Sequence, residues 1–364
     1  MTIPVSPLVL AGAGHTHLVT MRRWIERGYR APKGAVLVSP TPRAWYSGMM
    51  PGLVAGRFAE EQCAIDLAPL CEGCGLELVI GEIAKLEADK QLLTLRGGRM
   101  QGYEHLSLNV GSVPAQPRCA DYSVVMVPAK PFAPFANQWQ AWRKESGAME
   151  LAVLGGGPAA FELALALHQS LPQARLSLIC GGVLLAGMAP EAARRGRNLL
   201  VDHGIGITEH TRIERASGGW LMDEFHRVQK ASALLIATGA APLPWQASSG
   251  LDCDESGFIR INSRLQSVSH PQVLASGDCA SLPGTPHSGV YAVRQGAVLE
   301  QNISALLGSR SMQDYQPQHR ALVLMATADG GALMSYGRWS ASGRLAGMWK
   351  DHLDLGFMRR HRMD

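Results

Sequence analysis

A strand, a glycine turn and a helix follow one another at the start of the chain, and this unit constrains the fold more than any other feature. The apolar stretch 5–11 predicts a buried strand that runs into Gly12-Ala-Gly14. A helix is expected over residues 15–28 and a second strand over residues 35–39. Two strands joined through one helix favour a parallel sheet.

The same pattern recurs near residue 150. Residues 149–154 are apolar, and Gly155-Gly-Gly157 follows them. Residues 158–170 are rich in alanine and leucine and predict a helix, and residues 175–180 predict the next strand. Because one βαβ unit is repeated in this way, the sequence indicates two nucleotide-binding halves within one chain.

Further strands that end in glycine turns set the domain organisation. Strands are expected at 106–110, 233–237 and 272–276, each followed closely by a glycine. We therefore expect an α/β fold with two Rossmann-like dinucleotide-binding domains, one discontinuous and the other inserted into it, plus a small C-terminal region. The expected bounds are 1–125 and 246–310 for the discontinuous domain, 126–245 for the inserted domain and 311–364 for the C-terminal region.

Composition narrows the class of protein. Hydrophobic residues make up 46% and charged residues 18%, which is typical of a globular protein, and a net charge of +4 gives no case for nucleic-acid binding. Seven scattered cysteines predict no disulfide framework and favour a reducing compartment. Since neither a signal-peptide pattern nor an apolar run of about 18 residues occurs, we expect a cytoplasmic protein with small-molecule partners.

The two glycine turns differ in how well they match the dinucleotide pattern G-x-G-x-x-G. In the first, Gly12 permits the tight turn and Gly14 lets the backbone approach a diphosphate, but His17 occupies the place of the third glycine. A histidine there implies looser packing of helix on strand, or a ring fitted into the gap. The second turn has alanine, Ala160, in the third place and matches better.

Neither unit has the acidic residue that usually ends the second strand and binds ribose hydroxyls. Ser39 and Pro40 stand there in the first unit, and the Ser39 hydroxyl is expected to bind in its place. In the second unit the strand ends in Cys180-Gly-Gly182. The missing acid weakens the case for NADH, and no arginine is expected at that corner to favour NADPH.

Motifs in a fixed order cover about residues 5–360 and carry a family resemblance. They are Gly12-Ala-Gly-His-Thr-His17, Trp45-Tyr-Ser-Gly-Met-Met-Pro-Gly52, Asn109-Val-Gly-Ser112, Pro128-Ala-Lys-Pro131, Gly155-Gly-Gly-Pro-Ala-Ala-Phe-Glu162, Gly277-Asp-Cys-Ala280 and Gly289-Val-Tyr-Ala-Val-Arg-Gln-Gly296. Through them the sequence resembles the pyridine nucleotide–disulfide oxidoreductase superfamily, which includes type II NADH dehydrogenases. It is most similar to the branch found as a flavoprotein domain fused to selenide, water dikinase; no kinase domain is recognised in these residues, so dikinase activity is not expected.

The resemblance implies bound FAD, with NAD(P)H as co-substrate. Asp278 would accept hydrogen bonds from the ribityl hydroxyls, and the helix beginning at Gly289 would direct its N-terminus at the flavin pyrimidine ring. The residues implied for FAD are Gly12, Ala13, Gly14, His15, Ser39, Pro40, Ser47, Gly48, Pro51, Ile83, Gly111, Gly277, Asp278, Gly289 and Val290. Those implied for the pyridine nucleotide are Gly155, Gly157, Pro158 and Ala159.

Two side chains are candidates for a catalytic role, each with an alternative. By resemblance to type II NADH dehydrogenases, Glu162 would lie near nicotinamide and flavin; the alternative is a first-turn carboxylate that only complements the helix dipole. Lys130 would lie near the flavin and stabilise its anionic reduced form, or it is an exposed lysine of the hinge between domains. His15 and His17 are expected to be structural parts of the phosphate loop.

The remaining cysteine and C-terminal features are interpreted more simply. The pair Cys71 and Cys74 is expected at the end of a helix far from either glycine turn, so we predict neither a flavin-coupled disulfide nor a metal site.

The tail 345–363 mixes apolar and basic residues. It is expected to pack on the flavin domain with a basic solvated face; the alternative is peripheral contact with the inner membrane surface. A homodimer is left open.

The sequence therefore predicts an FAD-dependent oxidoreductase that passes electrons from NAD(P)H to a quinone, a sulfur or selenium compound, or oxygen. Two alternatives remain. One is a flavin-dependent oxidase or oxidoreductase whose middle domain does not use a pyridine nucleotide. The other is a flavin-binding partner of a selenophosphate-forming enzyme without turnover of its own.

Overall fold

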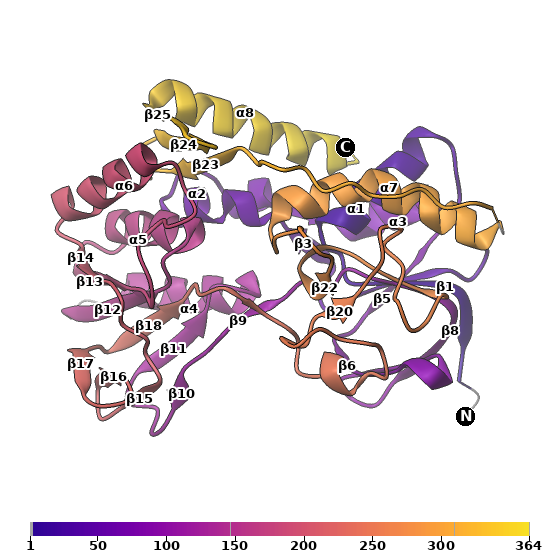
Figure 1. The fold of residues 1–364 in the computed structure, drawn as a ribbon, viewed down its shortest axis with the longest axis horizontal. Coiled ribbons are helices and arrows are strands. Elements are labelled where there is room, and N and C mark those ends of the chain that lie inside the picture. Colours follow the sequence, from indigo (N-terminus) through magenta and orange to yellow (C-terminus); the bar gives the residue numbers. More distant parts are fainter. Residues whose placement is uncertain (1–2, 146, 309, 364) are drawn as a thin grey trace.

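The computed structural model of the chain describes residues 3–145, 147–308 and 310–363. Two halves, each built on a mainly parallel sheet, lie side by side, and the C-terminal helix crosses from one to the other (Figure 1). The expected α/β class with two Rossmann-like domains is confirmed.

The first half is built from segments distant in the sequence. Its sheet has the order β5-β2-β1-β8-β7-β6, and β21 also pairs with β8. The parallel strands are β1 (Val5–Ala11), β2 (Val36–Ser39), β5 (Glu77–Ile80), β8 (Met100–Leu108) and β21 (Val273–Ala275), and the antiparallel ones are β6 (Ile83–Glu87) and β7 (Leu92–Leu95). The helices are α1 (His15–Glu26), α3 (Leu67–Cys74) and α7 (Gly289–Leu307). Because β21 joins β8 and α7 packs on α1, this half is discontinuous, as expected.

The middle half has a five-stranded parallel sheet in the order β11-β18-β12-β13-β14. Its strands are β11 (Val125–Pro128), β12 (Met149–Leu154), β13 (Ala174–Ile179), β14 (Gly206–Thr208) and β18 (Ala233–Ile236), and its helices are α4 (Phe132–Lys144), α5 (Pro158–Ser170) and α6 (Pro190–Asp202). A smaller sheet holds β10 (Arg118–Cys119), β15 (Arg215–Ser217), β16 (Trp220–Met222) and β17 (Arg227–Lys230). Strands β10 and β11 therefore begin before residue 126, where the boundary was expected.

Short strand pairs and the C-terminal elements complete the fold. The pairs are β3 (Arg43–Trp45) with β4 (Ala64–Asp66), β9 (Val113–Pro114) with β19 (Ala240–Ala241), and β20 (Ile259–Arg260) with β22 (Ala280–Ser281). Helix α2 (Met50–Val54) follows β3. The C-terminal region consists of the antiparallel sheet β23 (Val323–Ala326), β24 (Ala332–Tyr336) and β25 (Trp339–Gly343), and of helix α8 (Arg344–His361).

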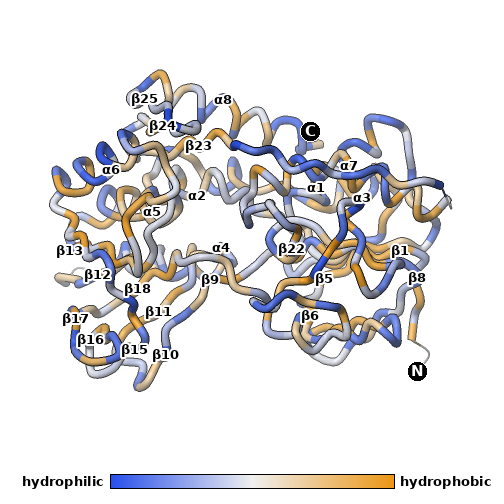
Figure 2. Tube along the Cα trace, in the orientation of Figure 1, coloured by the Kyte–Doolittle hydropathy of each residue, from blue (hydrophilic) through white to orange (hydrophobic). Residues whose placement is uncertain are grey.

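The central strands are apolar because helices cover both faces of a parallel sheet. Leu8, Val9 and Leu10 in β1 are almost fully buried, as are Leu151 and Val153 in β12. Figure 2 shows the resulting orange strands around β1 and β8, with hydrophilic segments along the outer surface. These buried strands fix the positions of the loops at their carboxyl ends.

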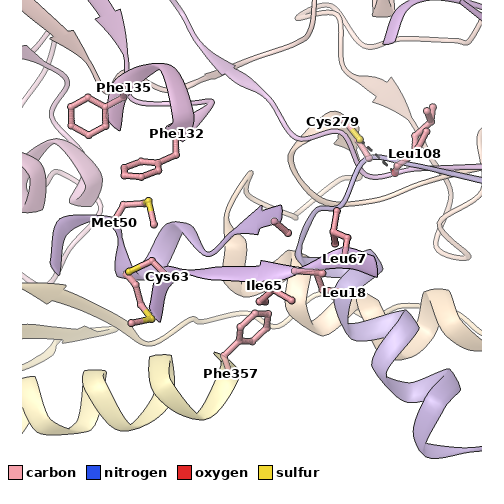
Figure 3. Close-up of a cluster of buried hydrophobic side chains, with 14 of the residues drawn as sticks. Leu18, Met50, Cys63, Ile65, Leu67, Leu108, Phe132, Phe135, Cys279 and Phe357 are labelled. Atoms are coloured by element: carbon pink, nitrogen blue, oxygen red, sulfur yellow. Dashed lines mark hydrogen bonds between the residues drawn. The ribbon is translucent and has the colours of Figure 1, made fainter. Parts of the chain in front are cut away.

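Apolar side chains also fill the junction where α8 meets the two halves. Figure 3 shows Phe132 and Phe135 of α4 near Met50 of α2, with Ile65 of β4 and Phe357 of α8 in the same region. The ring of Phe132 lies 5.0 Å from that of Trp45. This packing holds the end of the crossover between the halves against α2 and β3.

Candidate functional site

The side chain of Asn109, directly after β8, joins the first glycine turn to the Gly277-Asp278 segment. Its Oδ1 accepts hydrogen bonds from the backbone N–H groups of Thr16, at 3.1 Å, and His17, at 3.3 Å. Its Nδ2 donates to the carbonyl oxygen of Ser276, at 2.8 Å. One amide therefore holds together two stretches that lie more than 250 residues apart in the chain.

The glycines of this turn are required by close approach to Asn109. A Cβ on Gly12 would lie 2.4 Å from the Asn109 carbonyl oxygen, and Gly12 has φ +89°. A Cβ on Gly14 would lie 2.2 Å from Asn109 Oδ1. Gly277 has φ +67°, and its Cβ would lie 2.6 Å from Asn109 Nδ2. A side chain at any of these three positions would displace Asn109.

His17 fills the place of the third glycine with a buried ring. One ring nitrogen lies 2.6 Å from the Gly12 carbonyl oxygen and the other 2.8 Å from the Ser107 hydroxyl. Burial lowers the pKa of His17 to about 4, so the ring is neutral at pH 7. Of the two arrangements considered for this histidine, the ring fitted into the gap is confirmed, and its role is structural.

Free backbone N–H groups face the same region from two helices. Among the described residues, Ala13, Gly14 and His15 have no backbone or side-chain acceptor for their N–H groups, and neither have Gly289 and Val290. Helix N-termini with free N–H groups bind anions and polarised oxygens. A Cβ on Gly289 would lie 3.9 Å from the His15 ring, so the starts of α1 and α7 are neighbours.

Asp278 is held by a charged partner from the domain crossover. Lys130 Nζ lies 2.9 Å from Asp278 Oδ2 and 3.1 Å from the Ser112 hydroxyl, which also donates to Asp278. Burial pushes the pKa of Asp278 upward, but Lys130 and these hydrogen bonds outweigh it and hold the pKa below its usual range. Lys130 is thus a partly exposed ion-pair partner of Asp278.

The loop expected beside the flavin ring lies against α8. Ser47 and Gly48 belong to a short 3-10 turn, and Pro51 is buried at the start of α2. Lys350 of α8 donates a 3.1 Å hydrogen bond from Nζ to the Gly48 carbonyl oxygen. The tail helix therefore contributes a buried ammonium group to this loop.

The same ammonium group lies between two buried carboxylates. Lys350 Nζ is 3.1 Å from Asp354 Oδ2 and 3.7 Å from Glu162 Oε1. Burial raises the pKa of both carboxyl groups, although Lys350 opposes this. Glu162 also accepts a hydrogen bond from the Ala326 N–H of β23, at 2.7 Å. It is not in the first turn of α5, so the helix-dipole interpretation is wrong.

Aromatic rings continue this cluster toward the first glycine turn. The Tyr46 hydroxyl donates to Asp354 Oδ1 at 3.0 Å, and its ring stacks on Phe357 at 4.5 Å between centroids. The His15 ring lies 5.4 Å from the Tyr46 ring, and burial lowers the pKa of His15 to about 4. The loop at Tyr46, helix α8 and the first glycine turn are therefore in direct contact with one another.

The adenosine end of the expected FAD site lies at the carboxyl ends of β2 and β5. Ser39 is buried, and its hydroxyl donates to the Thr41 carbonyl at 2.8 Å while its backbone carbonyl accepts from Gly81 N–H. Pro40 is exposed beside it, and Ile83 follows two residues after Gly81. Ser39 therefore ends β2 beside the end of β5, and Gly111, with φ +73°, lies next to Cys279.

The second glycine turn makes a similar close backbone contact and is more exposed. A Cβ on Gly155 would lie 2.2 Å from the Ala237 carbonyl oxygen, which corresponds to the Gly12–Asn109 contact in the first half. Gly157 and Ala159 are exposed, and Pro158 begins α5. The nucleotide-binding residues expected here therefore stand at an open helix N-terminus.

The structure corrects one expectation at the end of β13. The loop after β14 places Arg212 there: a Cβ on Gly181 would lie 4.0 Å from the Arg212 Cβ. Arg212 lies about thirty residues downstream of Cys180, so inspection of the strand end alone could not find it. An arginine therefore does stand at this corner.

The cysteines show no redox arrangement. Cys71 and Cys74 are buried in α3, and burial raises the pKa of each thiol to about 12. Cys279 is buried next to Asp278, 3.7 Å from the Leu108 carbonyl oxygen (Figure 3), and burial raises its thiol pKa to about 11. Within residues 3–145, 147–308 and 310–363, no cluster of three or more metal-ligating side chains occurs.

Sequence reasoning missed several residues of this site. Asn109 was noted only as part of a motif, although a polar residue at a strand end before a glycine was a usable signal. Lys350 and Asp354 are one helical turn apart in the tail, a spacing that predicts an ion pair. Tyr46 was also noted only as part of a motif, and no local signal could indicate its contact with Asp354, which is 308 positions away.

Comparison with known proteins places these features in a family. Residues 14–296 match the family described as pyridine nucleotide-disulphide oxidoreductase. Ferroptosis suppressor protein 1 of Homo sapiens is 24% identical over 287 residues, which is 75% of this chain and 72% of that protein. The NADH dehydrogenase-like protein YutJ of Bacillus subtilis (strain 168) is 20% identical over 320 residues, or 86% of this chain and 87% of that one.

A solved structure has the same fold over almost the whole chain. The sulfide:quinone oxidoreductase from Aquifex aeolicus superposes with a TM-score of 0.77 at 16% identity, covering 99% of this chain and 92% of that one. At that identity the likeness concerns the fold. It extends through the C-terminal sheet and helix, beyond the residues that the family match covers.

Proposed function

This chain belongs to the pyridine nucleotide-disulphide oxidoreductase family, and from that premise we propose that it is an FAD-dependent oxidoreductase that takes hydride from NAD(P)H. Electrons then leave to a second acceptor: a quinone, a sulfur or selenium compound, or oxygen. The observation that carries the proposal is the Asn109 side chain, which joins the first glycine turn to the Gly277-Asp278 segment.

The residues present fit FAD. The amides of Ala13, Gly14 and His15 would hold the diphosphate at the start of α1, and Gly12 and Gly14 let this turn lie against Asn109. Asp278, kept ionised by Lys130, would accept hydrogen bonds from the ribityl hydroxyls. Ser39 still has free acceptor capacity for the adenosine ribose. FAD, when bound, supplies the capacity to accept a hydride and release its electrons.

The protein's own groups then have distinct roles. The N-terminus of α7 at Gly289 and Val290 would place its partial positive charge at the pyrimidine side of the ring, where negative charge develops on reduction. Lys130 orients Asp278 and adds positive charge nearby. Buried Glu162, whose pKa is raised by burial, is suited to hold a proton close to the loop 47–52.

The side chains near the loop 47–52 narrow the choice of electron acceptor. A quinone is the first candidate, because the Lys350–Asp354 pair, which Tyr46 contacts through its hydroxyl, can supply protons to a reduced quinone. The resemblance to the flavoprotein domain fused to selenide, water dikinase keeps a selenium or sulfur compound as the second candidate. The two are separated by measuring which one reoxidises the reduced protein.

Helix α8 is proposed to contact a membrane surface. Leu345, Met348, Trp349 and Leu353 share one face, and Leu345 and Met348 are 82% and 65% exposed. Within the described residues, no helix is long and apolar enough to cross a membrane. An exposed apolar face beside basic residues near the C-terminus fits burial at the surface of an anionic bilayer.

That contact is tested by sedimentation with phosphatidylglycerol vesicles. Leu345→Ser combined with Met348→Ser should abolish binding, whereas Tyr122→Ser, at an equally exposed position elsewhere, should leave binding unchanged. Equal binding by all three proteins would contradict the contact.

The function itself is tested by spectroscopy. The purified protein should show the two absorbance bands of an oxidised flavin, with one FAD per chain. Anaerobic addition of NADPH or NADH should bleach them. A protein that stays colourless with added FAD would exclude the proposal. A yellow protein that neither nucleotide bleaches would favour a middle domain that does not use a pyridine nucleotide.

A yellow protein that co-purifies with a selenophosphate-forming enzyme and passes electrons to no acceptor would instead favour the binding-partner alternative. Electron transfer to any tested acceptor would exclude that alternative.

A further inference from the structure

The corner at the end of β13 lacks any charged group of its own. In dinucleotide-binding folds this position faces the ribose 2′ position, where an acid binds the hydroxyl of NADH and an arginine accommodates the phosphate of NADPH. Here Cys180 turns inward: its thiol donates to the Gly182 carbonyl oxygen, and it lies 2.9 Å from where a Cβ on Gly156 would be. Gly181 and Gly182 follow, exposed and without side chains.

The loop after β14 is fastened to this corner by its backbone. Cys180 N–H donates to the Thr208 carbonyl oxygen at 2.9 Å, and Cys180 in turn accepts from Thr211 N–H at 3.0 Å. His210 N–H donates to the Gly182 carbonyl oxygen at 3.1 Å. These bonds fix the position of Arg212, the next residue along the loop, beside Gly181.

Arg212 is available for a ligand. Its side chain is 86% exposed and pairs at 3.2 Å with Glu214, which is itself half exposed. An exposed pair of this kind contributes little free energy, so a phosphate dianion can displace the carboxylate. A guanidinium group binds phosphate with two parallel hydrogen bonds.

The carboxylate on the same loop, Glu209, is held by two partners. Glu209 accepts the Leu184 N–H at 2.7 Å and pairs with Arg197, and together these partners hold its pKa below the usual range. Both partners engage Oε1, and they hold the carboxylate toward α6 and the segment after β13. Space for a larger group remains, because a Cβ on Gly182 would meet no atom within 4 Å.

We propose that Arg212 recognises the 2′-phosphate of the pyridine nucleotide, so that the donor is NADPH in preference to NADH. This inference rests on the proposed function, since it concerns the nucleotide that reduces the flavin. It makes Arg212 a specificity-determining residue, with Gly181 and Gly182 providing room for the phosphate.

Calorimetric titration with 2′,5′-ADP and 5′-AMP isolates the 2′-phosphate without any turnover. Wild type should bind 2′,5′-ADP at least tenfold more tightly than 5′-AMP, and Arg212→Ala should reduce the two affinities to the same value. Arg212→Lys should restore part of the difference. Arg215→Ala, an exposed arginine three residues farther along in β15, is the matched control and should behave as wild type. Equal affinities in wild type, or an undiminished difference in Arg212→Ala, would overturn the inference.

Anaerobic reduction of the flavin separates this inference from the proposed function. Faster bleaching by NADPH, with the preference lost in Arg212→Ala, supports both. Bleaching by NADH at an equal or greater rate overturns the inference and leaves the proposed function intact. If neither nucleotide bleaches the flavin, NAD(P)H is not the electron donor, which overturns both the inference and that part of the proposed function.

Discussion

The two glycine turns of this protein make the same kind of close backbone contact and differ in the side chains around it. Gly12 and Gly155 occupy equivalent positions, each against the carbonyl of the residue after a central strand. In the first half that residue is Asn109, whose side chain ties the turn to a distant segment; in the second it is Ala237, which has only a methyl group. The first turn is thus built into the core, and the second is left open.

The third position of each turn repeats the contrast. His17 fills it with a buried ring bonded to Gly12 and Ser107, and Ala160 fills it with a methyl group. A pre-organised turn binds its ligand with less loss of conformational freedom, which suits a cofactor that stays bound. An open turn suits a nucleotide that must leave after each turnover. The first turn is therefore suited to a cofactor that stays bound, and the second to a nucleotide that exchanges.

The largest expected effect comes from placing a methyl group in each turn. Gly12→Ala should yield protein without flavin, because its Cβ meets the Asn109 carbonyl and φ is +89°. Gly155→Ala should keep its flavin and lose reduction by NAD(P)H. The flavin-to-protein ratio and anaerobic bleaching measure the two outcomes.

Gly28→Ala is the control for backbone strain, since φ is +65° and no atom lies within 4 Å of the new Cβ. It should retain flavin and cost about 1 kcal/mol of stability. Loss of flavin in Gly155→Ala as well would erase the proposed division between the turns.

Asn109→Ala should make the first turn resemble the second. It removes the acceptor of two buried N–H groups and a donor to Ser276, so we expect a loss of roughly 3 kcal/mol in unfolding free energy and weaker flavin retention. Urea unfolding and release of flavin on dilution measure these. Thr238→Ala removes a hydroxyl that donates to the Ala115 carbonyl oxygen in the corresponding strand-end loop, and it should change both quantities much less. An Asn109→Ala protein as stable as wild type would show that the Asn109 hydrogen bonds are dispensable for folding.

His17→Ala copies Ala160 into the first turn and should cost roughly 2 kcal/mol at pH 7 through lost hydrogen bonds and packing. It should also weaken the dependence of stability on pH. With the folded pKa near 4 and the ordinary value at 6.5, the unfolded chain binds a proton that the folded protein refuses, so wild-type stability falls as pH falls through this window. Unfolding at pH 7 and pH 5 tests this; parallel losses in both proteins would contradict it.

Lys130→Met should have the smallest effect, about 1 kcal/mol at pH 7, because the lysine is partly exposed. The pKa of Asp278 lies below its ordinary value of 3.8, so the stability linked to its ionisation is present above that pH and is lost as pH falls through the folded pKa. The variant and wild type should therefore converge in strong acid. Lys90→Met, in an exposed pair with Glu87, should change stability little at any pH. A constant difference between Lys130→Met and wild type across pH would contradict the ion pair.

The sequence by itself determined the local elements of this protein. Strand β1, strand β12 and helix α5 were predicted with their observed bounds, because apolar periodicity and the glycine and proline signals act over a few neighbouring residues. The two glycine turns and the segment at Asp278 were found in the same way.

Only the tertiary structure decided which groups meet. Asn109 reaches Ser276, Tyr46 reaches Asp354, and Arg212 comes to lie beside Gly181. Each contact joins elements brought together by sheet order and helix packing, over separations that no local pattern records. Burial lowered the pKa of His17 and raised that of Glu162, and Lys130 lowered that of Asp278, since a pKa depends on surroundings that exist only once the chain has folded.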